Sequence, residues 1–329
     1  MMSARRPTRA RTSVVLTLIL LLAAGLAGTI GAQRSSQAAS ASHPIIFGSD
    51  SNTTALLATD EAILGHKMVG VRIYRLWGEP IFNSAAIAMR NSGHVLFVSV
   101  KAQTSRRAYV KWASIAAAQP GSALYAQMVS MAAQLKAYRS LVYFIFNHEP
   151  EARASLPNGN GPQFVAAWRK LITIFRQQHV TNAKYVATFT DWGFSRRDNR
   201  NVAYYYPGDA YVDAVAEDPY NWAGCRGESW KDLSTLVESM RVWGLSHRSK
   251  QLMLMEWGSA EDPRVPGHKA QWIARAAALF QQPAYSQFTA LLYWTHHGTP
   301  EGCHFTFRSS ASATAAWRAM GSLPAYRGV

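Results

Sequence analysis

Two glutamates lie at similar places in the sequence, each at the end of a short and strongly apolar run. Residues 146–150 read FNHEP, and Glu149 follows the apolar run 141–146. Residues 254–258 read LMEWG, and Glu256 follows the apolar run 252–255. A carboxylate at the end of a buried strand is costly to desolvate unless it is paired or functional. Both glutamates are therefore candidates for chemistry.

A pair of carboxyl groups that converge on one pocket suits hydrolysis of a glycosidic bond. In that reaction one carboxylic acid protonates the leaving oxygen, and one carboxylate attacks the anomeric carbon or activates a water molecule. The competing interpretation is that both glutamates form structural ion pairs with arginines. Convergence of the two side chains depends on the fold, so the elements that carry them decide between these interpretations.

Tryptophans also follow several of the apolar runs. Sugar rings stack their C–H faces on aromatic side chains, while polar groups bond the hydroxyls. We expect Trp222 and Trp294 to contact a sugar most directly, with Trp192 as a further candidate. The tryptophans that follow apolar runs are Trp77, Trp192, Trp222, Trp257 and Trp294, and the other six lie in or near helical segments, where packing is their expected role.

Eight short apolar runs alternate with segments of helical periodicity, best seen at 162–178, 230–245, 268–280 and 311–320. Continuous apolar strands are buried on both faces, as in parallel sheets covered by helices. The pattern predicts a single-domain α/β protein with a (β/α)8 TIM barrel, in which the active site lies at the carboxyl ends of the strands. An open doubly wound sheet is the alternative, but no GxGxxG motif follows the first run. The runs are 45–47, 69–74, 95–100, 141–146, 185–189, 211–215, 252–255 and 288–293.

The first 32 residues have the pattern of a secretory signal peptide. Arg5, Arg6, Arg9 and Arg11 precede an apolar run at 14–30, and small residues follow it. We predict a signal peptide at 1–32, a short linker at 33–43 and the barrel domain at 44–329. Retention of the run as a membrane anchor is the alternative. Either outcome predicts a secreted or cell-surface protein.

The formal net charge of the chain is +15, and removal of the four leader arginines leaves +11. A field of this sign favours anionic surfaces such as acidic glycans. Export argues against nucleic acid as a partner, and the scattered basic residues are also consistent with a merely solvated surface. Cys225 and Cys303 lie in polar, glycine-containing segments expected after the sixth and eighth strands. We predict a disulfide between them, with two free thiols as the alternative and no metal site, because two cysteines without CxxC spacing supply too few ligands.

The arrangement of motifs resembles the clan A glycoside hydrolases, and within that clan it is most similar to family 26, the β-mannanase family. The resemblance rests on His148 before Glu149, on Glu256 in the segment EWG, and on the segments YPGD at 206–209, YVD at 211–213 and DPY at 218–220. It implies that Glu149 is the general acid/base and Glu256 the nucleophile of a retaining enzyme. It covers most of the chain behind the leader.

The resemblance also implies supporting roles for other residues. Tyr220 would hydrogen-bond the nucleophile, His148 would support the site, and Arg72 would lie near the nucleophile, with Arg75 as the alternative because the register of strand two is open. The segment PEAR at 150–153 departs from the family's usual Met-Asn-Gly. Mannan specificity is therefore not implied, and related β-glycans, including acidic ones, stay open.

These inferences predict an exported, endo-β-mannanase-like glycoside hydrolase that cleaves a β-linked polysaccharide by double displacement and requires no cofactor. The alternative from another class is a catalytically silent barrel that binds cell-wall or cell-surface glycans. A basic protein that binds anionic polymers only through its charge is a third hypothesis, and it predicts salt-sensitive binding without bond cleavage.

Overall fold

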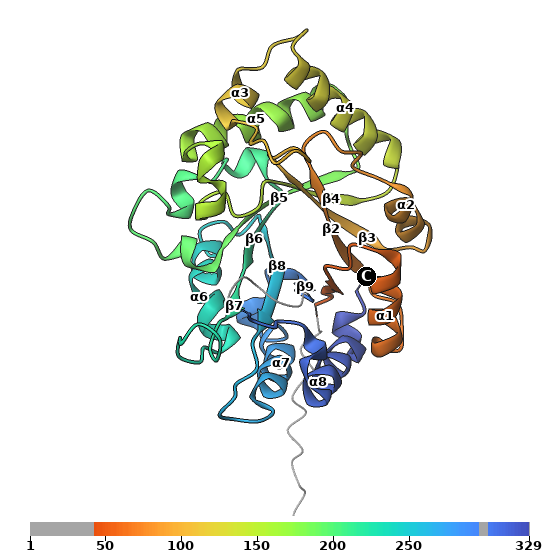
Figure 1. Ribbon diagram of the computed structural model, residues 1–329, viewed down its shortest axis with the longest axis vertical. Helices are drawn as coiled ribbons and strands as arrows, with labels where there is room; N and C mark the ends of the chain where they lie inside the picture. The colour runs from red at the N-terminus through yellow and green to blue at the C-terminus, as the bar shows by residue number, and fades with distance from the viewer. Residues whose placement is uncertain (1–42, 296–301, 329) are drawn as a thin grey trace, which may run out of the picture. The chain divides into compact units, whose positions relative to one another are not determined.

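Eight parallel strands form a closed barrel, which confirms the predicted fold. The computed structural model describes residues 43–295 and 302–328. Neighbouring strands pair in the order β6-β5-β4-β3-β2-β1-β9-β8, and a β6–β8 pairing closes the ring (Figure 1). The short β7 (Tyr220–Asn221) adds to β8 at the barrel mouth. The barrel strands are β1 (Ile46–Ser49), β2 (Gly70–Leu76), β3 (Val95–Lys101), β4 (Val142–Phe146), β5 (Ala183–Thr190), β6 (Ala214–Asp218), β8 (Gln251–Ser259) and β9 (Phe288–Tyr293).

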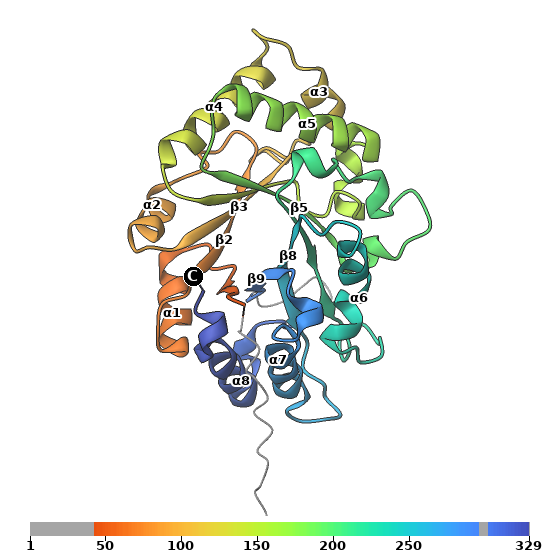
Figure 2. The same ribbon diagram turned by 180° about the vertical axis from the view of Figure 1, so that it is seen from behind.

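Helices surround the ring of strands, as the opposite views in Figures 1 and 2 show. The four predicted helical segments correspond to α5, α6, α7 and α8. The amphipathic α5 begins with a capping box, in which Asn160 accepts from the amide of Gln163 and the Gln163 side chain accepts from the amide of Asn160. No helix in the described part of the chain has the length and apolar character needed to span a membrane. The helices are α1 (Thr54–Leu64), α2 (Ser84–Asn91), α3 (Trp112–Ala117), α4 (Ala123–Tyr138), α5 (Gly161–Gln177), α6 (Leu233–Gly244), α7 (His268–Leu279) and α8 (Ala311–Ser322).

Alternation along the strands divides the apolar residues into two cores. One set fills the barrel interior, where Phe97 stacks on Tyr143 with ring centroids 4.4 Å apart, beside Met253 and Met255. The other set fills the layer between strands and helices. This division explains the continuous apolar runs, because successive residues of one strand enter different cores.

The predicted boundaries of the sixth strand, 211–215, are wrong by three residues. The strand is Ala214–Asp218, and residues Asp209–Tyr211 form a 3-10 turn. The carboxylate of Asp213 accepts a hydrogen bond of 2.8 Å from the amide of Tyr185, so this residue precedes the ladder. Because the strand begins and ends three residues later than predicted, it includes the acidic residues Glu217 and Asp218, and Asp218 lies at the mouth of the barrel.

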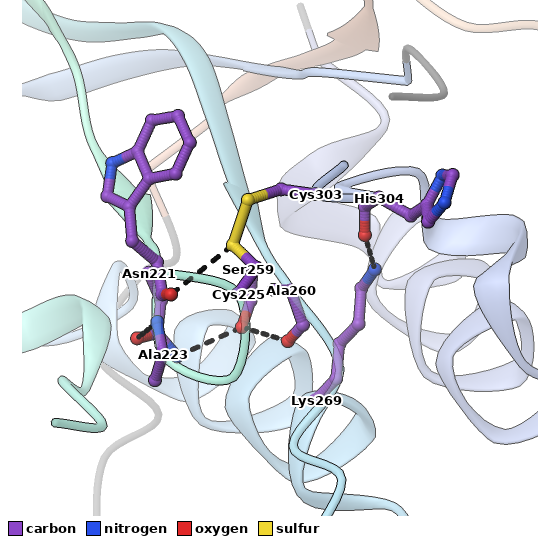
Figure 3. The surroundings of a disulfide bond; sticks show 9 residues. Asn221, Ala223, Cys225, Ser259, Ala260, Lys269, Cys303 and His304 are labelled. Atoms are coloured by element: carbon purple, nitrogen blue, oxygen red, sulfur yellow. Dashed lines mark hydrogen bonds between the residues drawn. A yellow bond between two sulfur atoms is a disulfide. The ribbon is translucent and has the colours of Figure 1, made fainter. Parts of the chain in front are cut away.

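The predicted signal peptide at 1–32 and the linker up to residue 42 lie outside the described residues. The two cysteines lie within them, and Cys225 is bonded to Cys303 with a Cα–Cα distance of 5.5 Å (Figure 3). Cys225 follows β7 and Cys303 follows β9, so the bond joins two segments on either side of β8. Lys269 of α7 also holds the segment that follows Cys303. Its ammonium donates hydrogen bonds of 3.0 and 2.6 Å to the carbonyls of Phe305 and Thr306.

We expect loss of the disulfide to lower the free energy of unfolding. The bond closes a loop of 78 residues, and the chain-entropy estimate for such a loop is on the order of 4 kcal/mol. Denaturant unfolding of the oxidised protein, the reduced protein and the Cys225→Ser/Cys303→Ser variant measures this difference. The double variant is the control, because a reductant should not change its midpoint. Equal midpoints for the oxidised and reduced protein would contradict the prediction.

Candidate active site

Glu256 is held as a buried carboxylate by three donors. Its Oε1 lies 3.0 Å from Arg72 Nη1 and accepts a hydrogen bond of 2.9 Å from the Tyr74 hydroxyl. Its Oε2 accepts one of 2.6 Å from the Tyr220 hydroxyl. Burial alone would raise the pKa of Glu256, but the charge of Arg72, followed by His148 and the two tyrosine hydroxyls, outweighs burial, and the pKa is lowered. The group is therefore ionised at neutral pH.

The position of Glu256 depends on an irregularity in β8. Glu256 is within this strand, which continues to Ser259, and does not end it as the sequence suggested. Between Leu254 and Trp257 the register against β9 shifts by one residue. Such a bulge changes the direction in which a side chain points. The irregularity falls on Met255 and Glu256, at the level where the side chains of β2 reach the same space.

Arg72, and not Arg75, is the arginine beside Glu256. Arg72 is fully buried and also donates to Ser99 Oγ and to Asp218 Oδ1, the latter at 3.3 Å. Arg75 lies on the other face of β2, where it donates to the carbonyls of Ile81 and Tyr74. The register of β2 thus resolves the alternative left open by the sequence.

Glu149 follows β4 and has a contrasting environment. It is partly buried, and it lines the same cavity as Glu256. Burial, followed by the negative charges of Glu256 and Glu151, raises the pKa of Glu149 to about 8. At neutral pH one carboxyl group of the cavity is therefore protonated and the other is ionised. Environments that separate two pKa values in this way assign an acid and a base.

His148, the residue before Glu149, also lies near Glu256. Its Nε2 is 4.0 Å from Glu256 Oε1, and its ring meets Tyr74 edge-on with centroids 5.9 Å apart. Burial, followed by the charge of Arg72, lowers the pKa of His148 to about 4, so the imidazole is neutral at pH 7. Burial also raises the pKa of Asp218 well above its usual value, with Glu256 as the next cause.

The cavity has a volume of about 1050 Å³ and contains the aromatic residues expected to bind a sugar. Trp192, Trp222 and Trp294 all line it. Trp77 and Trp257 do not, and both are buried in the core, where Trp257 packs against Trp272 and Tyr293. A position shortly behind a strand is therefore not enough to place a tryptophan in the cavity.

Cationic groups also line the cavity. The guanidinium of Arg226 lies over the ring of Trp222, with its carbon 3.2 Å from the ring centroid. Arg153 and Lys231 are the other basic residues of the lining, and Lys231 pairs with Glu228 at 3.0 Å. Within the described ranges, no group of three histidine, cysteine or acidic side chains has the geometry of a metal site.

Sequence reasoning missed several residues of this site, among them Tyr74, Asp218 and Phe305. Tyr74 bonds Glu256, and its position two residues after Arg72 on one strand would have placed both side chains on one face. The sequence shows Asp218 only as the first residue of the segment DPY, because the apolar pattern predicts that the sixth strand ends at residue 215. Phe305 lines the cavity and meets the Trp222 ring edge-on, with centroids 4.7 Å apart. Its segment has no strand pattern, and only the nearby Cys303 pointed to it.

Comparisons with known proteins agree with the resemblance in fold. No protein-family model matches the chain. Endoglucanase H of Acetivibrio thermocellus is 29% identical over 203 residues, which are 59% of this chain and 21% of that protein. The chain therefore spans about a fifth of the length of this relative.

Solved structures of family 26 mannanases share the fold. An endo-β-1,4-mannanase from Cellulomonas fimi matches with a TM-score of 0.64 and 17% identity, over 87% of this chain and 73% of that chain. The catalytic domain of an endo-β-1,4-mannanase from Bacillus sp. JAMB-750 matches with a TM-score of 0.61 and 13% identity, over 86% of each chain. A β-mannanase from Bacteroides ovatus matches with a TM-score of 0.58 and 13% identity, over 86% of this chain and 89% of that chain. The chain has a glycoside hydrolase family 26-like fold.

We expect Glu149→Gln to stabilise the protein at alkaline pH. The pKa of Glu149 is about 8 in the folded state and near 4.5 without its surroundings, so between these values the folded state holds a proton that the unfolded chain has lost. The contribution of protonated Glu149 to the free energy of unfolding is fully present below pH 4.5 and is lost as the pH rises to about 8. Glutamine cannot ionise, so the Glu149→Gln variant does not lose this part of its stability as the pH rises.

The stability advantage of Glu149→Gln should therefore grow between pH 5 and pH 9, by on the order of 2 kcal/mol after allowance for partial exposure. Denaturant unfolding of both proteins across this range measures it, with Glu228→Gln on the exposed rim as control. An advantage that does not change with pH would contradict the raised pKa.

Proposed function

We propose that this chain is a retaining glycoside hydrolase that cleaves a β-linked polysaccharide. The observation that carries the proposal is the pairing of a protonated Glu149 with an ionised Glu256 in one cavity lined by tryptophans. Their places after β4 and within β8 are those that the resemblance assigns to an acid/base and a nucleophile. The family 26-like fold adds support, since it brings both strand ends to one mouth.

In the first step, a carboxylate oxygen of Glu256 attacks the anomeric carbon while Glu149 donates its proton to the leaving glycosidic oxygen. Arg72, Tyr74 and Tyr220 orient the nucleophile. Their three contacts use both carboxylate oxygens, so the side chain has little freedom to rotate away from the cavity. The products are a glycosyl ester on Glu256, an ionised Glu149 and a free alcohol.

In the second step, Glu149 takes a proton from water while the water oxygen attacks the anomeric carbon. The bond between that carbon and Glu256 breaks, which releases the Glu256 carboxylate and the sugar. The ester no longer carries the negative charge of Glu256, which is the second largest cause of the raised pKa of Glu149. Loss of this charge lets Glu149 stay ionised and act as a base. Glu149 thus changes from acid to base, and Glu256 changes from nucleophile to leaving group.

The substrate class is a β-glycan, with mannan and glucan as the first candidates. Known proteins with this fold or with sequence similarity are named mannanases and an endoglucanase. Acidic β-glycans are also candidates, because Arg153, Arg226 and Lys231 line the cavity. The segment 150–153, which departs from the family pattern, supplies Arg153 beside the proposed acid.

We further propose that the enzyme acts outside the cytoplasm. The leader at 1–32 and the disulfide between Cys225 and Cys303 support export, because structural disulfides form in oxidising compartments. The rival hypothesis is a silent barrel that only binds glycans. It does not account for the opposite protonation states of Glu149 and Glu256.

Release of reducing sugar from a panel of mannan, xylan, mixed-linkage glucan and acidic glycans tests the proposal. We expect cleavage of at least one polymer by the wild type and none by Glu149→Gln/Glu256→Gln. The double variant should still bind that polymer in affinity electrophoresis, because the tryptophans remain. Binding without cleavage by the wild type would favour the silent barrel, and binding abolished by moderate salt would favour a purely electrostatic protein.

Azide rescue should separate the roles of the two glutamates. In Glu256→Ala, azide takes the place of the nucleophile and should give an α-azide from a β-glycoside. In Glu149→Ala, azide attacks the glycosyl ester and should give a β-azide, with activated leaving groups preferred. Proton NMR of the first product of the wild type should show retained configuration. An inverted anomer would rule out double displacement and the role of Glu256.

A further inference from the structure

The proposed acid/base, Glu149, lies in a segment with a strained, left-handed backbone. Asn147 and Glu149 have φ values of 45° and 51°, in the left-handed region that residues with a side chain rarely occupy. Such a residue is strained, and it persists only where its surroundings hold it. The segment 147–149 therefore requires contacts that fix it on both sides.

Asn147, on the amino-terminal side, is held by the loop after β3 and by Ser155 in the segment that follows β4. The Asn147 side chain accepts a hydrogen bond of 2.9 Å from the amide of Ala102 and donates one of 3.2 Å to Ser155 Oγ. The backbone amide of Glu149 donates to the carbonyl of Thr188 on β5 at 2.9 Å. These bonds fix the backbone up to Glu149 and leave its carbonyl side to other groups.

On the carboxyl-terminal side, the Glu149 carbonyl accepts a hydrogen bond of 3.1 Å from the amide of Ala152, and the side chain of Glu151 connects this loop to β5. Glu151 is fully buried, and it does not line the cavity. Its Oε1 accepts two hydrogen bonds of 2.6 Å, from the amide and from the hydroxyl of Thr190, the last residue of β5. A Cβ atom at Gly193 would lie 2.7 Å from this oxygen, so the absence of a side chain at Gly193 leaves room for the carboxyl group.

We propose that Glu151 is a positioning residue for the acid/base, which ties the loop after β4 to the end of β5 and so fixes the left-handed backbone that presents Glu149. The proposal rests on the function proposed above for Glu149. Neither the resemblance nor the fold assigns this role, and Glu151 belongs to the segment that departs from the family pattern. Glu151 acts through Glu149 and does not touch the substrate.

Glu151 also has an electrostatic effect on Glu149. Burial raises the pKa of Glu151 to about 7, against the hydrogen bonds from Thr190. After burial and Glu256, its negative charge is the next cause of the raised pKa of Glu149. Position and charge can be separated, because a glutamine keeps an Oε1 acceptor for Thr190 but carries no charge.

The test compares three variants in the full-length protein. Glu151→Ala removes the tie, and we expect kcat to fall about 100-fold with little change in KM, as for a displacement of the acid by about 1 Å. Glu151→Gln should restore kcat to within about 3-fold of wild type and move the alkaline limb of the kcat profile to lower pH. Thr190→Val, which keeps the amide donor and removes the hydroxyl, should lie between them.

Thr188→Val is the matched control, because the Thr188 hydroxyl is buried on the same strand without a hydrogen-bond partner among the described residues. It should leave kcat and the pH profile near those of the wild type. If Glu151→Ala does not fold, the kcat values and pH profiles of Glu151→Gln and Thr190→Val still test the proposal. A wild-type pH profile in Glu151→Gln, together with a wild-type kcat in Thr190→Val, would overturn the proposal.

A second readout is independent of hydrolysis. Amide hydrogen exchange at Glu149 should accelerate at least 10-fold in Glu151→Ala, or in Thr190→Val if the alanine variant does not fold, and stay unchanged in Thr188→Val. Faster exchange in the variant, together with a wild type that has no glycosidase activity, would mean that the tie exists and the proposed function fails. Unchanged exchange in an active enzyme would overturn the tie and leave the function intact.

Discussion

The buried ion pair between Arg72 and Glu256 is the interaction on which the site depends. The two side chains come from β2 and β8, which β1 and β9 separate in the sheet. A fully buried guanidinium is tolerated only where acceptors surround it, and Ser99, Asp218 and Glu256 supply them. Closure of the barrel is what brings these groups together. The order of the strands therefore both buries Arg72, Asp218 and Glu256 and brings their opposite charges together.

The different protonation of the two glutamates follows from this pair. Arg72 keeps Glu256 ionised, and the resulting negative charge opposes ionisation of Glu149 in the shared cavity. Tyr74 and Tyr220 strengthen the first effect, because their hydroxyls donate hydrogen bonds to the ionised carboxylate of Glu256. A single buried cation thus orders the charges of a mouth that contains several more acidic groups, among them Asp191 and Asp218.

Much of the fold could be predicted from the sequence, and less of the site. Runs buried on both faces identified all eight strands, because barrel strands have no solvent-exposed face to interrupt the apolar pattern. The sixth boundary failed where the acidic residues Glu217 and Asp218 end a strand, since burial of acids has no local signal. Arg72 and Arg75 could not be distinguished before the register was known. Phe305 lies on irregular chain whose position depends on long-range contacts, and no periodicity describes such a segment.

The segment that carries Phe305 is held by a crosslink, by a lysine and by one side chain of the sheet, since the Tyr293 hydroxyl on β9 donates to the Phe305 carbonyl at 3.0 Å. The disulfide at Cys303 and the ammonium of Lys269 hold its backbone from two sides, while its side chain faces the cavity. The Phe305 ring itself packs against Tyr220 of β7, with ring centroids 4.8 Å apart, and Tyr220 is the residue that bonds Glu256. An exchange of residue 305 should therefore act first on the side chains around Glu256, while the crosslink and Lys269 keep the backbone of this segment in place.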